Sequence, residues 1–145
     1  MPRDTARAEE HIAAPPAEVL ATIHDVATQP DWIPEIKEVE VLDSDAEGRV
    51  LRAALAAATA VGTDRYTLRY THRPDGIHWT MESGRLQTAQ EGDLRAVPEG
   101  DGGTLATYEL TIEHPLPLPG FVRSRVIKGL VTGTLTGLRE RHERA

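Results

Sequence analysis

Two runs of alternating side chains flank the turn sequence Arg73-Pro74-Asp75-Gly76. Proline presets φ and Asp-Gly accepts positive φ, so this pattern predicts a β-hairpin. The large apolar residues of the two runs fall on one face, Tyr66, Leu68 and Tyr70 before the turn and Ile77, Trp79 and Met81 after it. Tyr70 is then expected opposite Trp79 and Leu68 opposite Met81, and each such pair stabilises a sheet by roughly 0.2–1 kcal/mol.

Alternation, helical spacing and turn residues along the rest of the chain predict the order strand, two short helices, about six strands and a long helix. The expected strands span 6–13, 36–42, 49–61, 65–71, 77–82, 86–97 and 104–113, with Gly92 as a possible bulge, and the helices span 15–27, 31–33 and 120–141. One helix can bury an antiparallel sheet of six or seven strands only if the sheet curls around it. The sequence therefore predicts an α+β fold, and its 145 residues fit one domain, residues 1–145.

Composition excludes several classes of function. The chain has 16 Lys and Arg against 23 Asp and Glu, a net charge of −7, which opposes general nucleic-acid binding. It has no cysteine and no HExxH motif among its six histidines, so we expect no metal, and it has no phosphate loop or dinucleotide fingerprint, so we expect no cofactor. The mostly apolar stretch 126–138 is shorter than the ~20 residues of a spanning helix, so no stable membrane insertion is expected. The sequence opens without an apolar signal-like segment, and we expect a cytoplasmic location.

Four short segments carry a resemblance to a known superfamily. They are IAAPPAEV at 12–19, WIPEIKEV at 32–39, Gly102-Gly103-Thr104 before Tyr108, and Leu118-Pro119-Gly120-Phe121. The chain resembles the START-like, or Bet v 1-like, superfamily (SRPBCC), and within it the bacterial polyketide cyclase/dehydrase and lipid transport group. The resemblance implies a helix-grip fold with a cavity between the curved sheet and the C-terminal helix. Members of the superfamily bind lipids, quinones, polyketides or plant hormones, and some catalyse aromatisation or cyclisation.

The leading hypothesis is therefore binding or transport of an apolar small molecule without catalysis. Most large aromatic residues converge on the inward face of the predicted sheet, which suits an apolar pocket with a few phenol donors. The simpler alternative is that these side chains only fill the core. The expected ligand-binding residues are Trp32, Ile36, Tyr66, Leu68, Tyr70, Trp79, Met81, Tyr108, Leu110, Phe121, Ile127 and Val131.

The alternative from a different class is a polyketide aromatase/cyclase. Its candidate catalytic residues are Tyr66, Tyr70 and His72, since His72 is in phase with Tyr70 and could act as a base at the pocket mouth. The resemblance ascribes such catalysis to polar side chains, including arginine, inside the cavity. Here the inward phase offers only phenols, His72 and either Thr88 or Gln90, which favours binding over catalysis.

Glycines repeat every four residues in the long helix, at Gly129, Gly133 and Gly137. They fall opposite the apolar stripe, and each costs roughly 1 kcal/mol relative to alanine. Three explanations remain open: close contact with a partner, either as a helix-mediated interaction module or as a weak homodimer, a soft helix that opens to admit ligand, or simple exposure without a role.

Overall fold

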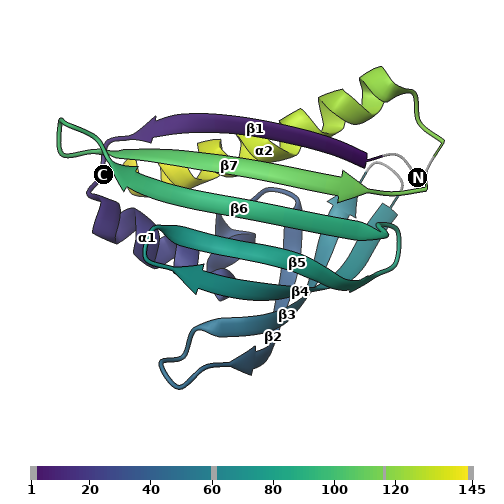
Figure 1. The fold of residues 1–145 in the computed structure, drawn as a ribbon, viewed down its shortest axis with the longest axis horizontal. Coiled ribbons are helices and arrows are strands. Elements are labelled where there is room, and N and C mark those ends of the chain that lie inside the picture. The colour runs from purple at the N-terminus through teal and green to yellow at the C-terminus, as the bar shows by residue number, and fades with distance from the viewer. Residues whose placement is uncertain (1–2, 60–61, 116, 144–145) are drawn as a thin grey trace.

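The computed structural model describes residues 3–59, 62–115 and 117–143 (Figure 1). Seven strands in these ranges form one antiparallel sheet in the order β1-β7-β6-β5-β4-β3-β2. The strands are β1 (Arg3–Ile12), β2 (Ile36–Ser44), β3 (Val50–Thr59), β4 (Gly62–Arg73), β5 (Gly76–Gly84), β6 (Ala89–Pro98) and β7 (Thr104–Glu113). The helices are α1 (Pro16–His24), the 3-10 helix η1 (Val26–Asp31) and α2 (Gly120–Glu143). The predicted α+β helix-grip architecture is confirmed.

The long helix α2 determines where the interior lies. It packs chiefly against β1 and also against β7, and Figure 1 shows it crossing behind these two strands of the curved sheet. Its predicted apolar stripe is buried, with Ile127, Val131, Leu135 and Leu138 at most 3% exposed. Because α2 covers only one side of the concave face, the inner face of β3 and β4 lies beside the helix and not beneath it.

The β4–β5 hairpin has the predicted register. Tyr70 lies opposite Trp79 and Leu68 opposite Met81, and Arg73 pairs with Gly76 around a two-residue loop. The aromatic rings of Tyr70 and Trp79 have centroids 6.1 Å apart, and that of Tyr108 lies 5.7 Å from Trp79. Local turn chemistry and alternation were sufficient to fix these pairs.

The expectation of a bulge at Gly92 was wrong. The β5–β6 and β6–β7 ladders run through it without a register shift, opposite Trp79 and Leu110. A Cβ on Gly92 would lie 2.1 Å from Cζ2 of Trp79, so the glycine leaves the space in which the indole rests on β6. The close approach of the Trp79 indole, and not a break in the strand, explains why a glycine stands at position 92.

Several predicted boundaries differ from the structure, and three of the differences have an identifiable reason. The first helix ends at His24 and not at residue 27, because the backbone leaves helical geometry at Asp25, with φ −89° and ψ 76°. The second short helix is the 3-10 helix η1 at Val26–Asp31 and not the predicted 31–33, since residues after Asp31 turn toward β2. Strand β6 begins at Ala89 and not at residue 86, because the Leu86 amide donates to Oδ1 of Asp64 at 2.9 Å instead of to a neighbouring strand.

The alanine-rich run is a strand, as predicted, although alanine favours helix. It forms β3, which pairs with β2 on one side and β4 on the other. Residues 60–61 of the predicted strand lie outside the described residues. Pairing on both edges overrides the local propensity, and the small Ala53 and Ala57 side chains are buried on the sheet's inner face.

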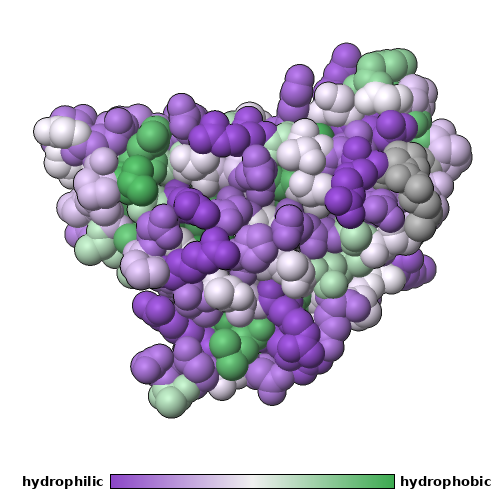
Figure 2. All heavy atoms as spheres, viewed as in Figure 1, coloured by the Kyte–Doolittle hydropathy of each residue, from purple (hydrophilic) through white to green (hydrophobic). Residues whose placement is uncertain are grey.

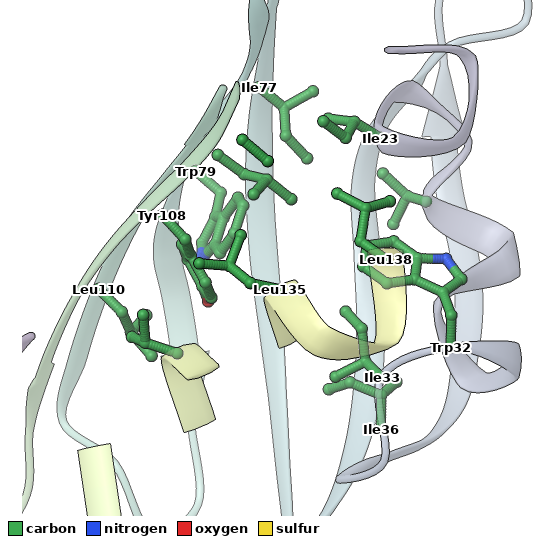
Figure 3. Close-up of a cluster of buried hydrophobic side chains, with 14 of the residues drawn as sticks. Ile23, Trp32, Ile33, Ile36, Ile77, Trp79, Tyr108, Leu110, Leu135 and Leu138 are labelled. Atoms are coloured by element: carbon green, nitrogen blue, oxygen red, sulfur yellow. The ribbon is translucent and has the colours of Figure 1, made fainter. Parts of the chain in front are cut away.

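Most large apolar side chains lie in the interior of the fold. Figure 3 shows Trp79, Tyr108 and Leu110 extending from the sheet toward Leu135 of α2, and Trp32 pointing toward Leu138. The face seen in Figure 2 is mostly hydrophilic, with small separate hydrophobic patches. The exposed large apolar residues are scattered along the chain, at Val41, Leu42, Leu51, Val97, Phe121 and Val126.

The glycines of α2 do not form a uniformly outward face. A Cβ on Gly137 would lie 1.8 Å from the backbone oxygen of Trp32, so this glycine lets the segment after η1 approach the helix. A Cβ on Gly133 would lie 3.5 Å from Oε1 of Glu35, and one on Gly129 would meet nothing within 4 Å. The expectation of an outward stripe was therefore wrong at Gly137, which the chain itself covers. A homodimer through this face stays a prediction.

Candidate functional site: a cavity between the sheet and α2

A cavity of about 90 Å³ lies beside α2, against the inner face of β3 to β7. Most of its wall is apolar, and the segment between η1 and β2 closes one side. The lining residues are Gln29, Ile33, Glu35, Ile36, Leu55, Ala57, Ala58, Thr59, Tyr66, Leu68, Tyr70, Trp79, Gln87, Gln90, Leu94, Tyr108, Leu110, Ile112, Leu130 and Thr134. The cavity is not fully enclosed.

The side chains of three tyrosines, Tyr66, Tyr70 and Tyr108, line this cavity. Burial raises the pKa of Tyr66, Tyr70 and Tyr108 far above the ordinary value for tyrosine. The hydroxyls are close enough that a charge on Tyr66 would also raise the pKa of the other two. Because the pKa values are raised, these side chains stay protonated at neutral pH and are suited to donate hydrogen bonds.

The Tyr70 hydroxyl has no hydrogen-bond partner. It is the one buried side-chain oxygen or nitrogen in the described part of the chain that is left unpaired. The Tyr70 side chain as a whole is 5% exposed. An unpaired buried hydroxyl costs on the order of 1–3 kcal/mol, so native structures seldom keep one without a reason. A ligand atom that accepts a hydrogen bond would remove this cost.

A chain of amide groups forms the polar wall of the cavity. The Trp79 indole Nε1–H donates to Oε1 of Gln90 at 2.9 Å, and Nε2 of Gln90 donates to Oε1 of Gln87 at 2.8 Å. Nε2 of Gln87 then donates to the buried carboxylate of Asp64 at 3.0 Å. Burial and the nearby Asp64 raise the pKa of Tyr66, and an interaction with Gln90 offsets part of this rise. The hydrogen bond to Gln90 holds the indole of Trp79 in a fixed orientation.

The matching family model is described as polyketide cyclase / dehydrase and lipid transport, and it covers residues 3–143. The chain belongs to this family. Membership of the polyketide cyclase/dehydrase and lipid transport family implies binding of hydrophobic ligands in general. No protein among those with curated functions matches the sequence.

Solved structures similar to this family member share its fold at low identity. A START superfamily protein from Mycobacterium smegmatis superposes with a TM-score of 0.87 at 23% identity, over 96% of this chain and 97% of that one. The Zhui aromatase/cyclase from Streptomyces sp. R1128 gives 0.80 at 17%, over 98% and 94%. Ginseng major latex-like protein 151 from Panax ginseng gives 0.74 at 8%, over 98% and 99%. These likenesses establish the helix-grip fold and no more.

The structure brings seven of the predicted ligand-binding residues together in the cavity wall. They are Ile36, Tyr66, Leu68, Tyr70, Trp79, Tyr108 and Leu110. Their common origin is strand phase, since all but Ile36 lie on the inner face of β4 to β7. That these residues bind ligand stays a prediction.

Five other predicted residues lie outside the cavity wall. Ile127 and Val131 are buried in the core, and Leu130 and Thr134 of α2 line the cavity in their place. Phe121 is 70% exposed in the first turn of α2.

Trp32 is buried but lines a separate groove between η1 and α2, and its indole N–H donates to Oγ1 of Thr28 at 3.2 Å. Met81 is half-buried near the end of β5, where its Sδ would lie 2.9 Å from a Cβ on Gly84.

His72 lies away from the cavity, where both ring nitrogens have partners. Its Nε2–H donates to the Val50 carbonyl at 2.7 Å, which leaves Nδ1 to accept from Nδ1–H of His24 at 2.8 Å. Burial lowers the pKa of His24, and the nearby Arg49 and His72 lower it further. This pair joins α1 to the sheet and leaves His72 no free nitrogen for the role of a base at the pocket mouth.

Sequence reasoning missed several polar residues that form the wall or, like Asp64, lie directly behind it. Asp64 shares the phase of Tyr66, Leu68 and Tyr70 on β4, so alternation places it inward. Gln90 was one of two expected inward residues, and the other, Thr88, is exposed and donates to the Glu113 carbonyl at 3.2 Å. Glu35 and Thr134 carried no comparable signal, because a loop and the flank of a helix supply them.

No helix of the described residues combines the length and the apolar character that crossing a membrane requires. Within the same ranges, no three histidine, aspartate or glutamate side chains come together as a set of metal ligands.

Proposed function

We propose that this domain binds or transports a small, mostly apolar molecule that carries at least one oxygen, of lipid, quinone or polyketide type, without catalysing a reaction on it. The observation that carries the proposal is the buried, unpaired hydroxyl of Tyr70 in the wall of the cavity. A carbonyl or hydroxyl oxygen on the ligand would accept its hydrogen bond and fix the ligand's orientation.

The size of the cavity limits what enters it. At about 90 Å³ it is smaller than the roughly 150 Å³ cavity that holds a benzene molecule. A bound ring therefore requires small outward movements of the wall, or extends through the open side. Burial of about 150 Å² of apolar ligand surface would contribute about 4 kcal/mol, from which the cost of association is subtracted. Because association costs about 4 kcal/mol or more, this burial together with a hydrogen bond worth about 1 kcal/mol gives a single-ring compound only weak affinity.

The same wall supports binding over catalysis. In the described lining there is no histidine, lysine or arginine, and the phenols stay protonated because burial raises their pKa, so the Glu35 carboxylate is the one group that could take up a proton, and no acid-base partner stands beside it. General acid–base catalysis works best with a group whose pKa lies near the operating pH. The Zhui aromatase/cyclase shares the fold at 17% identity, and a shared fold alone does not carry that activity to this chain.

A matched pair of ligands tests the proposal. Acetophenone and α-methylstyrene have nearly the same shape, but only acetophenone has an oxygen that can accept a hydrogen bond. We expect the wild-type protein to bind acetophenone about tenfold more tightly in isothermal titration calorimetry, since one hydrogen bond contributes about 1 kcal/mol and an unpaired donor costs more.

The variant Tyr70→Phe should remove this preference and still bind α-methylstyrene. Tyr66→Phe is the matched control, because the Tyr66 hydroxyl already interacts with Gln90. Failure of both compounds to bind the wild-type protein would overturn the proposal. If Tyr66→Phe lost the preference for acetophenone as fully as Tyr70→Phe, the assignment of the hydrogen bond to Tyr70 would be overturned.

A further inference from the structure

Glu35 is the one charged side chain in the described lining of the cavity. It belongs to the short segment between η1 and β2 and is half-buried. Among the described residues its carboxylate has neither a hydrogen bond nor an ion pair, although the chain forms many ion pairs elsewhere, for example between Arg52 and Glu82. Because no cation compensates its charge, this half-buried carboxylate is available for electrostatic interaction with a ligand in the cavity.

Contacts on two sides hold Glu35 at the edge of the cavity. Its backbone carbonyl accepts from the Ala58 amide at 2.8 Å, which ties the segment to the end of β3. Its Oε1 lies 3.5 Å from the place a Cβ on Gly133 would take, an ordinary contact distance, so the carboxylate lies directly beside α2. The charge of Glu35 also raises the pKa of Tyr66 and Tyr108, which shows that its field reaches the phenol end of the cavity.

This arrangement discriminates between ligands by charge. A carboxylate on a ligand would share a poorly solvated space with the Glu35 carboxylate. At about 6–8 Å and the effective dielectric constant of a partly buried site, the repulsion weakens binding by about tenfold or more. A neutral hydroxyl suffers no such repulsion and can donate a hydrogen bond to the carboxylate.

We propose that Glu35 makes the cavity selective for neutral ligands that bear hydroxyl or carbonyl groups and that it rejects carboxylates, including fatty-acid anions. This inference rests on the proposed function, because it requires that the cavity hold a ligand. Glu35 is then a specificity-determining residue that sets the chemical class of the cargo.

The test uses 4-methylbenzyl alcohol and 4-methylbenzoate, two probes of similar shape that differ in charge. Affinities are measured by calorimetry at 0.15 M salt, where exposed charges are screened beyond about 8 Å. Glu35→Gln should strengthen binding of 4-methylbenzoate about tenfold and change binding of the alcohol by less than about threefold. The control Glu40→Gln makes the same change in net charge at an exposed position of β2 and should leave both affinities unchanged.

The outcomes separate the two proposals. If the alcohol binds wild-type protein and Glu35→Gln leaves the affinity for 4-methylbenzoate unchanged, or changes it only as much as Glu40→Gln does, charge selectivity by Glu35 is overturned and cavity binding stands. If the alcohol does not bind the wild-type protein, the proposed function fails and the selectivity fails with it.

Discussion

Removal of the Tyr70 hydroxyl should stabilise the ligand-free protein, which is the reverse of the usual effect of deleting a buried polar group. The hydroxyl has no partner, so Tyr70→Phe removes a desolvation cost of about 1–3 kcal/mol and breaks no hydrogen bond. The lost oxygen enlarges the void by on the order of 10 Å³, which costs about 0.2 kcal/mol at about 24 cal/mol per Å³. The net expectation is a gain of about 1–2 kcal/mol in the free energy of unfolding.

Urea denaturation followed by tryptophan fluorescence measures this gain. Tyr70→Phe should raise the midpoint with an unchanged m-value, and the melting temperature should rise by about 3–6 °C for a chain of this size. Tyr66→Phe, which deletes a hydroxyl that interacts with Gln90, should lower stability by about 0.5–1.5 kcal/mol. A loss of about 1 kcal/mol or more in Tyr70→Phe would show that the hydroxyl is hydrogen-bonded in solution, and the reasoning about an unpaired donor would be refuted.

Two further predictions concern α1 and α2. The folded pKa of His24 lies below its ordinary value of 6.5, so its contribution to stability is complete above about pH 6.5 and is lost as pH falls through the folded pKa. Urea midpoints between pH 5 and 8 should show this loss, and His24→Gln should reduce the slope by up to one proton, about 1.4 kcal/mol per pH unit; an unchanged slope contradicts it. Gly129→Ala should add up to about 1 kcal/mol, because its Cβ meets open space, whereas Gly137→Ala should destabilise the protein because its Cβ collides with the Trp32 carbonyl. Thermal melts of the two variants check this pair, and equal effects would mean that the close approach at Gly137 is absent.

The candidate site divides into a part that strand phase predicts and a part that it cannot. Alternation on β4 placed Tyr66, Leu68 and Tyr70 on the inner face, and turn chemistry placed Trp79 opposite Tyr70. Phase also carried the information for Asp64, although its polarity makes it look like a surface residue. These placements depend on residues a few positions apart, for which backbone geometry is fixed.

The positions of α2 and of the loop before β2 depend on contacts between distant segments. Helical spacing identified the buried stripe of α2, but the packing of that stripe against β1 decided that Leu130 and Thr134, not Ile127 and Val131, face the cavity. Glu35 reaches the cavity only because the segment after η1 is held against α2, where Gly137 admits the Trp32 backbone. The sequence by itself determined the strands, the helix stripe and the hairpin register, since each follows from local periodicity. Only the tertiary structure decided which residues of the sheet, of α2 and of the loop before β2 line the same cavity. That depends on how far the sheet curls past one side of the helix.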